Sequence, residues 1–432
     1  MKSLTAEKEV QVAELPSEVV IPLSQHIGWP SKVLVEVGDK VLKGQKIGEA
    51  GGFISAAIHA SISGTVKSIE PFIHPSGGKS DAVIITSDGE DKLHESLVAR
   101  TDEEIAALSA EDIRNIVQEA GIVGLGGAAF PTHVKLSPPP DKKIENLILN
   151  GAECEPYLTC DYRVMMEYTS EIIGGIFLIM KALGVSRGRI GIEINKRAAG
   201  RKFLDQLDTM ADSKNDLDLE VVPLYVKYPQ GAEKNLIYAL TGQEVPSGGL
   251  PMDVGCVVQN VGTALAVWEA VRYNKPLYER VMTITGYGIK TPRNLLVRVG
   301  TMFSDLVRQC GGFRGTPGKI ISGGPMMGIA QYTTDFPVIK GTSGAVVFPV
   351  EVVKERQEMP CVRCARCVDA CPAYLLPTTL ARLAKKRRFE EAGDMGLNDC
   401  VECGSCTFIC PARIPIVQWI KHGKMELKNA KS

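Results

Sequence analysis

Eight of the twelve cysteines occur in two copies of one spacing near the C-terminus. The second copy follows the first by 39 residues, and each copy ends in a Cys-Pro pair. This C-x2-C-x2-C-x3-C-P spacing binds pairs of [4Fe–4S] clusters, and the fourth cysteine of each run ligates the other cluster. The spacing therefore predicts one cluster on Cys361, Cys364, Cys367 and Cys410, and a second on Cys400, Cys403, Cys406 and Cys371.

Two other uses of cysteine fit this pattern less well. A structural zinc site usually pairs one C-x2-C with a second, distant one, whereas here three cysteines fall within seven residues. A disulfide framework requires an oxidising compartment. The pattern therefore favours clusters, which pass single electrons. We interpret three further cysteines as ordinary buried thiols: Cys160, Cys256 and Cys310.

Length and composition indicate a soluble protein of several domains. The 432 residues are enough for roughly three domains of about 150 residues each. The net charge of −1 gives no reason to expect nucleic-acid binding. Residues 2–14 are polar and lack a signal-type apolar core, and the apolar stretch 172–185 is too short to span a bilayer. We therefore expect a chain that is neither secreted nor membrane-spanning, in a reducing cytoplasm that suits clusters and thiols.

The N-terminal region predicts a small β-module. Residues 17–98 contain short strand-like runs separated by glycine turns, including 33–37, 41–48 and 62–66. The sequences VGDKVLKGQKIGEA and ASISGTVKSI resemble the two halves of a biotinyl/lipoyl-type barrel-sandwich domain. Those domains carry a modifiable lysine in the hairpin between the halves, but no lysine lies between Lys46 and Lys67. We therefore expect a structural module without a swinging cofactor.

The middle of the chain predicts a parallel α/β domain. A helical stripe covers residues 102–119. Strand-like and helix-like segments then alternate, which is typical of βαβ units with helices on both faces of a parallel sheet. The expected strands are 144–150, 189–194, 217–224 and 256–260, and the expected helices are 163–183, 196–211, 231–240 and 262–273.

Two further modules complete the expected organisation. Strand-like runs at 281–285, 295–299 and 319–322, with a helix at 302–309, predict a small β-grasp module. Between the two cysteine runs, Leu380, Leu383 and Phe389 indicate a helix. This spacer predicts a helical ferredoxin domain rather than a compact β-rich one.

A glycine-rich stretch precedes the first strand of the α/β region. Residues 121–135 read GIVGLGGAAFPTHVK. Glycines let the backbone approach a ligand closely and expose N–H groups to anions. Lys135 could meet a phosphate as a point charge. On spacing alone, a simple turn explains the stretch equally well.

Four segments in order resemble one family. They are GLGGAAFPTHVK (124–135), NGAECEPYLTCD (150–161), YPQGAEKNLI (228–237) and QNVGTALAV (259–267). They are similar to the flavin- and NADH-binding subunit of respiratory complex I, and more so to the RnfC family of Rnf electron-transport complexes. The resemblance covers nearly the whole chain. It implies a barrel-sandwich domain at 1–100, a Rossmann-like FMN/NADH domain at 101–278, a β-grasp SLBB-like domain at 279–345 and a helical two-cluster ferredoxin domain at 346–432.

The resemblance also implies cofactor contacts. Phe130 matches an aromatic residue that stacks on NADH, and Glu155 an acid that contacts the nucleotide. The positions that match FMN contacts are Gly124, Gly126, Gly127, Lys135, Asn150, Glu153, Cys154, Tyr228, Gly231, Glu233, Asn260 and Thr263. From the residues alone, Phe130 could instead be core, Glu153 a cap and Glu155 a surface charge.

Three positions depart from the complex I pattern. Leu125 stands where that pattern has arginine, Ala152 where it has aspartate, and Cys154 where it has serine. These departures fit the Rnf-like branch better and leave the nucleotide pose open.

The resemblance implies an NADH-linked oxidoreductase and translocase subunit without a catalytic protein base. Hydride would pass between NAD(H) and FMN, and single electrons between FMN and two [4Fe–4S] clusters. The chain would lie peripherally on the cytoplasmic face of the cell membrane. Its partners would be membrane and iron–sulfur Rnf subunits, linked indirectly to ferredoxin and to Na+ or H+ movement.

Two other functions remain open. One is a soluble flavin/iron–sulfur NADH reductase of the microcompartment cobalamin-reductase type, although the N-terminal place of the barrel-sandwich module favours the Rnf type. The other is an electron-transfer adaptor that has lost nucleotide binding. In addition, the basic stretch 382–388 could steer an acidic electron carrier or could be a solvated helix face.

Overall fold

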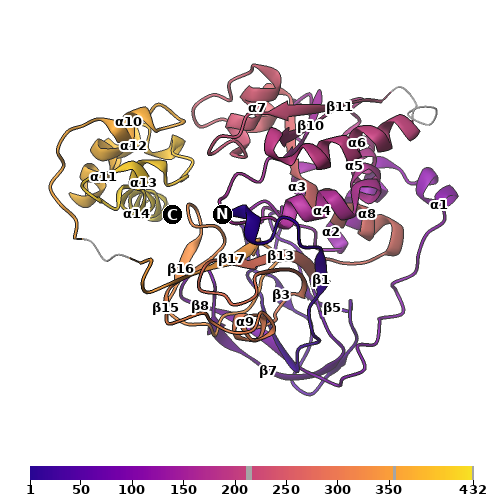
Figure 1. Cartoon of the computed structure of the whole chain (residues 1–432). Helices are drawn as coiled ribbons and strands as arrows, with labels where there is room; N and C mark the ends of the chain where they lie inside the picture. Colours follow the sequence, from indigo (N-terminus) through magenta and orange to yellow (C-terminus); the bar gives the residue numbers. More distant parts are fainter. Residues whose placement is uncertain (211–216, 354–356, 431–432) are drawn as a thin grey trace.

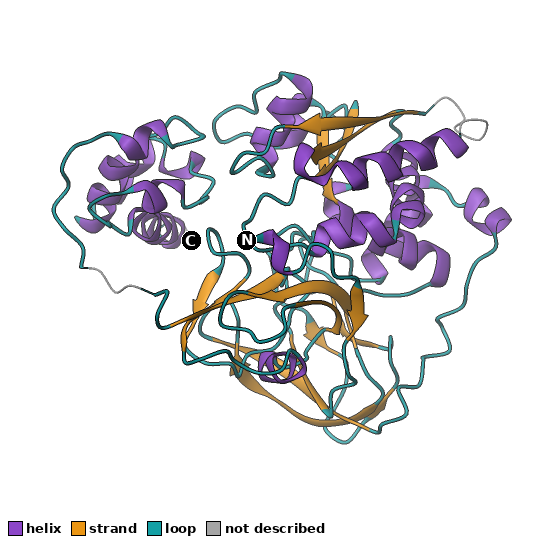
Figure 2. Cartoon of the chain, viewed as in Figure 1, coloured by secondary structure: helices purple, strands orange, loops and turns teal. Residues whose placement is uncertain are grey.

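The computed structural model describes residues 1–432 except 211–216, 354–356 and 431–432. Figures 1 and 2 show a β-rich base, an α/β layer above it and a helical C-terminal domain to one side. This arrangement follows the order of modules that the sequence predicts.

The N-terminal module is a sandwich of two small sheets. Alternate strand residues such as Val19, Ile47 and Ile85 fill the core between them. The prediction of a strand over 33–37 was wrong, because only residues 32–33 pair there and the chain then turns toward solvent at exposed Val37. One sheet has the order β2 (Glu18–Pro22), β8 (Lys79–Ser87), β7 (Gly64–Ile73), β4 (Lys40–Val41), and the other β3 (Lys32–Val33), β5 (Lys46–Glu49), β6 (Ile58–His59).

The α/β layer has the expected parallel sheet. Leu147 and Leu149 point into the core shared with α5 (Thr169–Leu183) and α8 (Val261–Tyr273), and Ile148 points to the opposite core with α7 (Glu233–Thr241). Helices therefore cover both faces of the sheet, as predicted. The strand order is β11 (Asp218–Leu224), β10 (Arg187–Glu193), β9 (Asn146–Gly151), β12 (Cys256–Asn260), with α3 (Thr132–Lys135), α6 (Arg197–Thr209), α7 (Glu233–Thr241) and α8 (Val261–Tyr273) around it.

Two predicted helices are each divided. The stripe at 102–119 forms α1 (Asp102–Ala107) and α2 (Ala110–Glu119), because the Ser109 hydroxyl accepts a hydrogen bond from Asp112 N and begins a new helix. The segment 163–183 forms α4 (Cys160–Glu167) and α5 (Thr169–Leu183), which are separated by non-helical Tyr168. Apolar periodicity alone does not reveal such breaks.

The third sheet takes one strand from the N-terminus. Strand β1 (Val10–Val12) pairs in parallel with β14, so the first residues of the chain lie outside the sandwich. The order is β1, β14 (Arg293–Arg298), β13 (Glu279–Thr285), β17 (Gly344–Pro349), β15 (Pro317–Ser322), β16 (Ile329–Gln331), and α9 (Phe303–Gln309) packs on this sheet.

Buried polar contacts fix the N-terminal segment. The amide of Asn294 donates to the carbonyl of Thr5 over 2.9 Å, and its oxygen accepts from the hydroxyls of Thr159 and Thr283, each at 2.9 Å. The hydroxyls of Thr5 and Thr159 are 2.6 Å apart. Because buried polar groups are costly when unpaired, this network holds the first residues against both the α/β layer and the third sheet.

The C-terminal domain is helical, as predicted. Leu380, Leu397, Ile416 and Ile420 form its core. Residues 357–430 contain no strand. The helices are α10 (Arg366–Asp369), α11 (Pro377–Lys385), α12 (Phe389–Asp394), α13 (Ser405–Ile409) and α14 (Ile416–Asn429).

Specific hydrogen bonds dock this domain on the rest of the chain. The Tyr228 hydroxyl donates to the carbonyl of Cys403 over 2.7 Å. The carboxylate of Asp399 accepts from the Ser247 hydroxyl at 2.6 Å and from Gly248 N at 3.2 Å. The loop before α13 is thereby held against the α/β layer.

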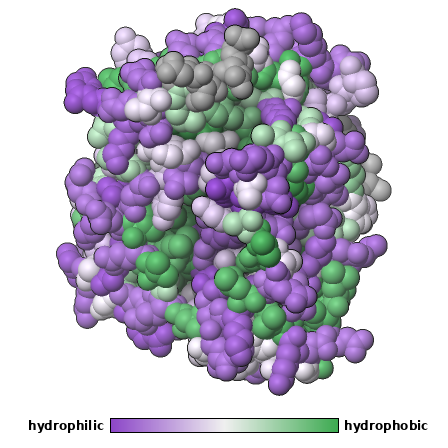
Figure 3. Space-filling view, turned by 90° about the vertical axis from the view of Figure 1, so that its right-hand side faces the viewer, coloured by the Kyte–Doolittle hydropathy of each residue, from purple (hydrophilic) through white to green (hydrophobic). Residues whose placement is uncertain are grey.

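Among the described residues, no helix is long and apolar enough to cross a membrane. Figure 3 views the side of the molecule away from the C-terminal domain, which is mostly hydrophilic with separate apolar patches.

A buried lysine joins the sandwich to the α/β layer. Lys340 is 1% exposed, and its ammonium donates to the carbonyls of Ala57 at 2.6 Å and Gly121 at 2.8 Å. No carboxylate pairs with it among the described residues, and burial lowers its pKa to about 7. Burial, followed by the charge of Lys340, also lowers the pKa of His26 to about 4 and that of His59 well below its usual value.

Replacing Lys340 should change how stability depends on pH. Between the folded pKa near 7 and the unfolded value of 10.5, the unfolded chain binds one more proton, so the free energy of unfolding of the native chain rises with pH. Relative to Lys340→Met, the native chain should gain about 1.4 kcal/mol per pH unit in this window. His26 and His59 stay neutral there. Thermal unfolding at pH 7 and pH 9 measures the gap, and exposed Lys143→Met is the control; parallel pH profiles for native and Lys340→Met chains would contradict the assignment.

Tyr228→Phe should loosen the docked C-terminal domain. The change removes one donor to the Cys403 carbonyl, which costs about 1 kcal/mol. Hydrogen exchange should accelerate at the amides of 403–406 and stay unchanged in β9. The matched control is Tyr238→Phe, a change at a tyrosine that is 55% exposed. Equal exchange rates in all three proteins would mean that the hydroxyl does not hold the domain.

Candidate functional site

The glycine-rich stretch forms a loop between α2 and α3. Gly124 N donates to the carbonyl of Phe130 over 2.9 Å and closes the loop. Leu125 N donates to the Thr263 hydroxyl over 2.9 Å, which ties the loop to the first turn of α8. Gly127 has a φ of +136°, and a Cβ there would meet nothing within 4 Å. The backbone therefore turns sharply and leaves open space, as a loop that receives a ligand requires.

The N-terminus of α8 faces this loop. The side-chain oxygen of Asn260 accepts from Gly262 N over 2.8 Å and caps the helix. Its amide donates to the carboxylate of Asp161 over 2.7 Å. A Cβ at Gly126 would lie 3.4 Å from Asn260. The structure thus brings Gly126, Asn260 and Thr263 together beside a helix N-terminus, which favours anions.

Lys135 lies at the end of α3 and points across to α7. Its ammonium donates to the Glu233 carboxylate over 2.7 Å and to the carbonyl of Val258 over 3.1 Å. Both side chains remain partly exposed. The sequence predicts both residues as ligand contacts, and the structure places them as a pair.

The loop after β9 contacts the loop that precedes α7. The Asn150 amide donates to the carbonyl of Gly231 over 2.9 Å, and Gly231 N donates to the Cys154 sulfur over 3.3 Å. Burial raises the pKa of Cys154 to about 11, so the thiol is neutral at pH 7. Buried Lys196 donates to the carbonyl of Ala152 over 2.5 Å and pairs with Glu193 at 3.0 Å. These contacts fix the loop after β9 against the end of β10.

Glu153 lies in a cluster that sequence reasoning missed in part. Its carboxylate accepts from Asp161 N over 2.7 Å and lies 3.4 Å from the Lys2 ammonium. Lys2 also donates to the carbonyls of Glu153 at 2.5 Å and Leu158 at 2.6 Å. Burial, then the charge of Glu153, raises the pKa of Asp161 to about 6. No local motif links Lys2 to residues that follow it by 151 positions or more.

Arg280 is a second residue that the motifs do not reveal. This buried side chain of β13 donates to the carbonyls of Lys340 at 2.5 Å and Leu125 at 3.4 Å. Burial lowers its pKa, and the nearby Cys160 and Asp161 oppose that shift. The guanidinium therefore supports the glycine loop from inside.

Glu155, in the loop after β9, contacts the segment between β15 and β16. Its carboxylate accepts from Met327 N at 2.7 Å and Met326 N at 3.2 Å. Burial raises its pKa although these amides act in the opposite direction. Burial, then the Glu155 charge, raises the pKa of the neighbouring Tyr228 phenol. Phe130 is half-buried, and none of the hydrogen bonds or ring contacts among the described residues joins it to Glu155.

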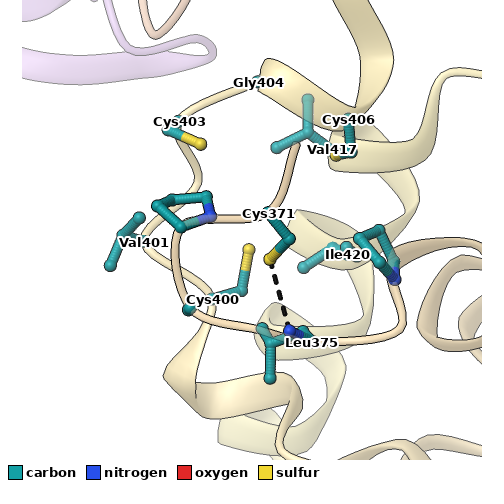
Figure 4. Close-up of a pocket in the computed structure, with 12 residues that line it drawn as sticks. Cys371, Leu375, Cys400, Val401, Cys403, Gly404, Cys406, Val417 and Ile420 are labelled. Carbon is teal, nitrogen blue, oxygen red and sulfur yellow. Dashed lines mark hydrogen bonds between the residues drawn. The ribbon is translucent and has the colours of Figure 1, made fainter. Parts of the chain in front are cut away.

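The eight repeated cysteines separate into two groups. Figure 4 shows Cys371, Cys400, Cys403 and Cys406 around one pocket, whose apolar walls include Leu375, Val417 and Ile420. Leu375 N donates to the Cys371 sulfur over 3.4 Å. We call these four cysteines the inner thiol set, since Cys403 contacts Tyr228.

The other four cysteines line a wider cavity of about 560 Å³. Cys361 and Cys364 are exposed there, whereas Cys367 is buried. We call this group the outer thiol set: Cys361, Cys364, Cys367 and Cys410. Each set draws three cysteines from one run and one from the other, so the donor sets fit two [4Fe–4S] clusters with exchanged fourth ligands. Cys160, Cys256 and Cys310 are buried elsewhere, as expected.

Comparison with known protein families identifies the same four modules in order. The RnfC barrel sandwich hybrid domain matches residues 1–90 and the Nuo51 FMN-binding domain residues 117–269. The SLBB domain matches residues 281–330 and the 4Fe-4S dicluster domain residues 360–414. These matches confirm a barrel-sandwich, an FMN-binding, an SLBB and a 4Fe-4S ferredoxin module in the predicted order.

Solved structures show the same fold at low identity. The chain is similar to an NAD+-reducing [NiFe]-hydrogenase in the H2-reduced state, with 20% identity and a TM-score of 0.54. The alignment covers 74% of this chain and 63% of that one.

Curated relatives are similar over most of their length. The chain is 49% identical to the C subunit of the proton-translocating ferredoxin:NAD(+) oxidoreductase complex of Clostridium ljungdahlii, over 99% of this chain and 92% of that protein. It is 45% identical to the Na(+)-translocating counterpart of Acetobacterium woodii, over 99% and 94%. It is 42% identical to the C subunit of the ion-translocating oxidoreductase complex of Rhodobacter capsulatus, over 100% and 82%. The chain therefore belongs to the family of C subunits of ion-translocating ferredoxin:NAD+ oxidoreductase complexes.

Proposed function

We propose that this chain exchanges electrons between NAD(H) and the iron–sulfur partners of an Rnf-type complex on the cytoplasmic face of the membrane. The observation that carries the proposal is the position of Tyr228. Gly231, three residues after Tyr228, contacts Asn150 at the end of β9, where the sequence predicts FMN contacts. The Tyr228 hydroxyl contacts the inner thiol set through Cys403. One short loop therefore connects a two-electron site to a one-electron site.

The residues around the glycine loop would hold FMN. Lys135 and the α8 N-terminus supply positive potential for the phosphate, and Gly126 and Gly127 allow close approach of the backbone. Asn150, Glu153 and Cys154 would contact the ring or ribityl side. FMN, when bound, converts hydride transfer with a nicotinamide into single-electron transfer. Glu155 would orient the nucleotide by accepting from ribose hydroxyls, and Phe130 would stack on it.

The two thiol sets would each hold one cluster, and the two clusters would act one after the other in electron transfer. The inner set lies beside Tyr228, so its cluster would exchange electrons with the flavin. The outer set opens to solvent, so its cluster would exchange electrons with a partner protein. The inner set has apolar walls, whereas Cys361 and Cys364 of the outer set are exposed, a difference that would tune the cluster potentials.

Lys135→Ala should weaken FMN retention without loss of iron. The change removes a phosphate-facing cation and leaves Glu233 unpaired, so the FMN dissociation constant should rise by about 10- to 100-fold. Flavin fluorescence on dilution measures release, and iron analysis monitors the clusters. Exposed Lys143→Ala is the matched control. Equal loss of flavin and iron would indicate misfolding and would contradict the assignment.

Cysteine variants should reveal the exchanged ligands. Cys371 belongs to the first cysteine run in the sequence but to the inner thiol set in the structure. Cys371→Ala should therefore impair the same cluster as Cys400→Ala. Cys361→Ala should impair the other cluster. Anaerobic NADH titration with low-temperature EPR distinguishes the two signals. If Cys371→Ala removes the signal that Cys361→Ala removes, the ligands are not exchanged. Flavin bleaching without any cluster signal in the native chain would contradict the proposed path.

A further inference from the structure

Positive side chains surround the outer thiol set. Arg363, Arg382 and Lys385 line its cavity together with one acid, Glu358. Glu358 pairs with Lys385 at 3.3 Å, so it does not neutralise either arginine. Arg363 and Arg382 form no ion pair among the described residues. The entrance to the outer site therefore carries free positive charge.

The charge of the C-terminal domain changes sign along its sequence. Residues 357–388 contain seven Lys and Arg against two acids, and residues 389–404 contain five acids and no Lys or Arg. Three of these five acids make contacts within the chain. Asp399 accepts from Ser247 and Gly248, Glu391 pairs with Arg388, and Glu402 pairs with Lys424 at 3.1 Å. The cations of the first segment mostly face solvent. Asp399 of the acidic part thus helps dock the domain on the α/β layer, whereas the exposed cations of the basic part are available to a partner.

The end of α11 extends the positive surface. Lys386 and Arg387 are exposed and unpaired among the residues that the structure describes. We call Arg363, Arg382, Lys385, Lys386 and Arg387 the basic rim. Val362, 67% exposed, and Leu376, 47% exposed, line the same cavity. Exposed apolar groups within a charged ring are typical of protein interfaces, where apolar contact gives affinity and charge gives orientation.

We propose that the basic rim is the docking surface for an acidic electron-transfer protein whose exposed redox centre is surrounded by carboxylates. The proposal rests on the proposed function, because it assumes that the outer thiol set carries a cluster. One electron passes between the two centres, one centre is oxidised as the other is reduced, and no bond or proton changes place. Anionic lipid would also attract cations, but the rim surrounds a cysteine-lined cavity, and the Leu380 and Leu383 face of α11 is already buried.

Charge reversal on α11 tests this proposal. Arg382→Glu/Lys386→Glu leaves every cysteine in place. With a small acidic two-cluster ferredoxin, reduced beforehand, the second-order rate of cluster reduction should fall by about 10- to 100-fold at low ionic strength. The native rate should fall steeply with added salt, because salt screens the attraction. With a basic c-type cytochrome as acceptor from NADH, the same variant should react faster than the native chain.

Matched controls separate docking from the internal path. Arg197→Glu/Arg201→Glu changes two exposed arginines on α6, far from the thiol sets, and should leave the ferredoxin rate unchanged. NADH reduction of the clusters, followed by EPR, should be equal in all three proteins. An unchanged ferredoxin rate in the α11 variant would overturn the docking surface. So would loss of binding to phosphatidylglycerol vesicles without loss of the ferredoxin rate. Failure of NADH to reduce the native clusters would instead refute the proposed function.

Discussion

The contact between Tyr228 and Cys403 is the constraint that sets where the C-terminal domain lies against the α/β layer. Electron transfer weakens steeply with distance, so a hydride site and a cluster site are useful together only if they stay close. Here a tyrosine hydroxyl, two donors to Asp399 and the approach of Gly404 to Met326 hold the inner thiol set against the α/β layer. These few contacts lie where the distance between the two sites is set.

Three positive side chains, of which Arg280 and Lys340 are buried and Lys2 is partly exposed, position the loops behind this contact. These side chains come from distant parts of the chain. Lys2 donates to the carbonyl of Glu153, Arg280 to that of Leu125 and Lys340 to that of Gly121. Such charges lose hydration on burial, so they persist only when backbone carbonyls or carboxylates compensate them. These hydrogen bonds fix the backbone on both sides of the glycine-rich loop.

The C-terminal domain has two distinct sides. One contacts the rest of its own chain, and the other carries the basic rim that we propose as a docking surface. The charge differs between these sides. Asp399 accepts hydrogen bonds from the α/β layer, whereas Arg363, Arg382 and Lys385 line the cavity of the outer thiol set. Electrostatic steering acts over about 10 Å at ordinary salt, so a basic entrance can orient a partner before contact.

The sequence by itself determined the ligand chemistry and the order of modules. Cysteine spacing is local and covalent, so Cys361 to Cys410 predicted paired clusters without any fold, and the alternation of strands and helices predicted the parallel sheet. The sequence did not predict the helix breaks at Ser109 and Tyr168, because capping and a change of direction leave the apolar periodicity intact. Only the tertiary structure brought Lys2 to Glu153, Tyr228 to Cys403 and β1 to β14. These pairs are separated by 151 residues or more, and the burial and backbone geometry that join them have no signature in the order of residues.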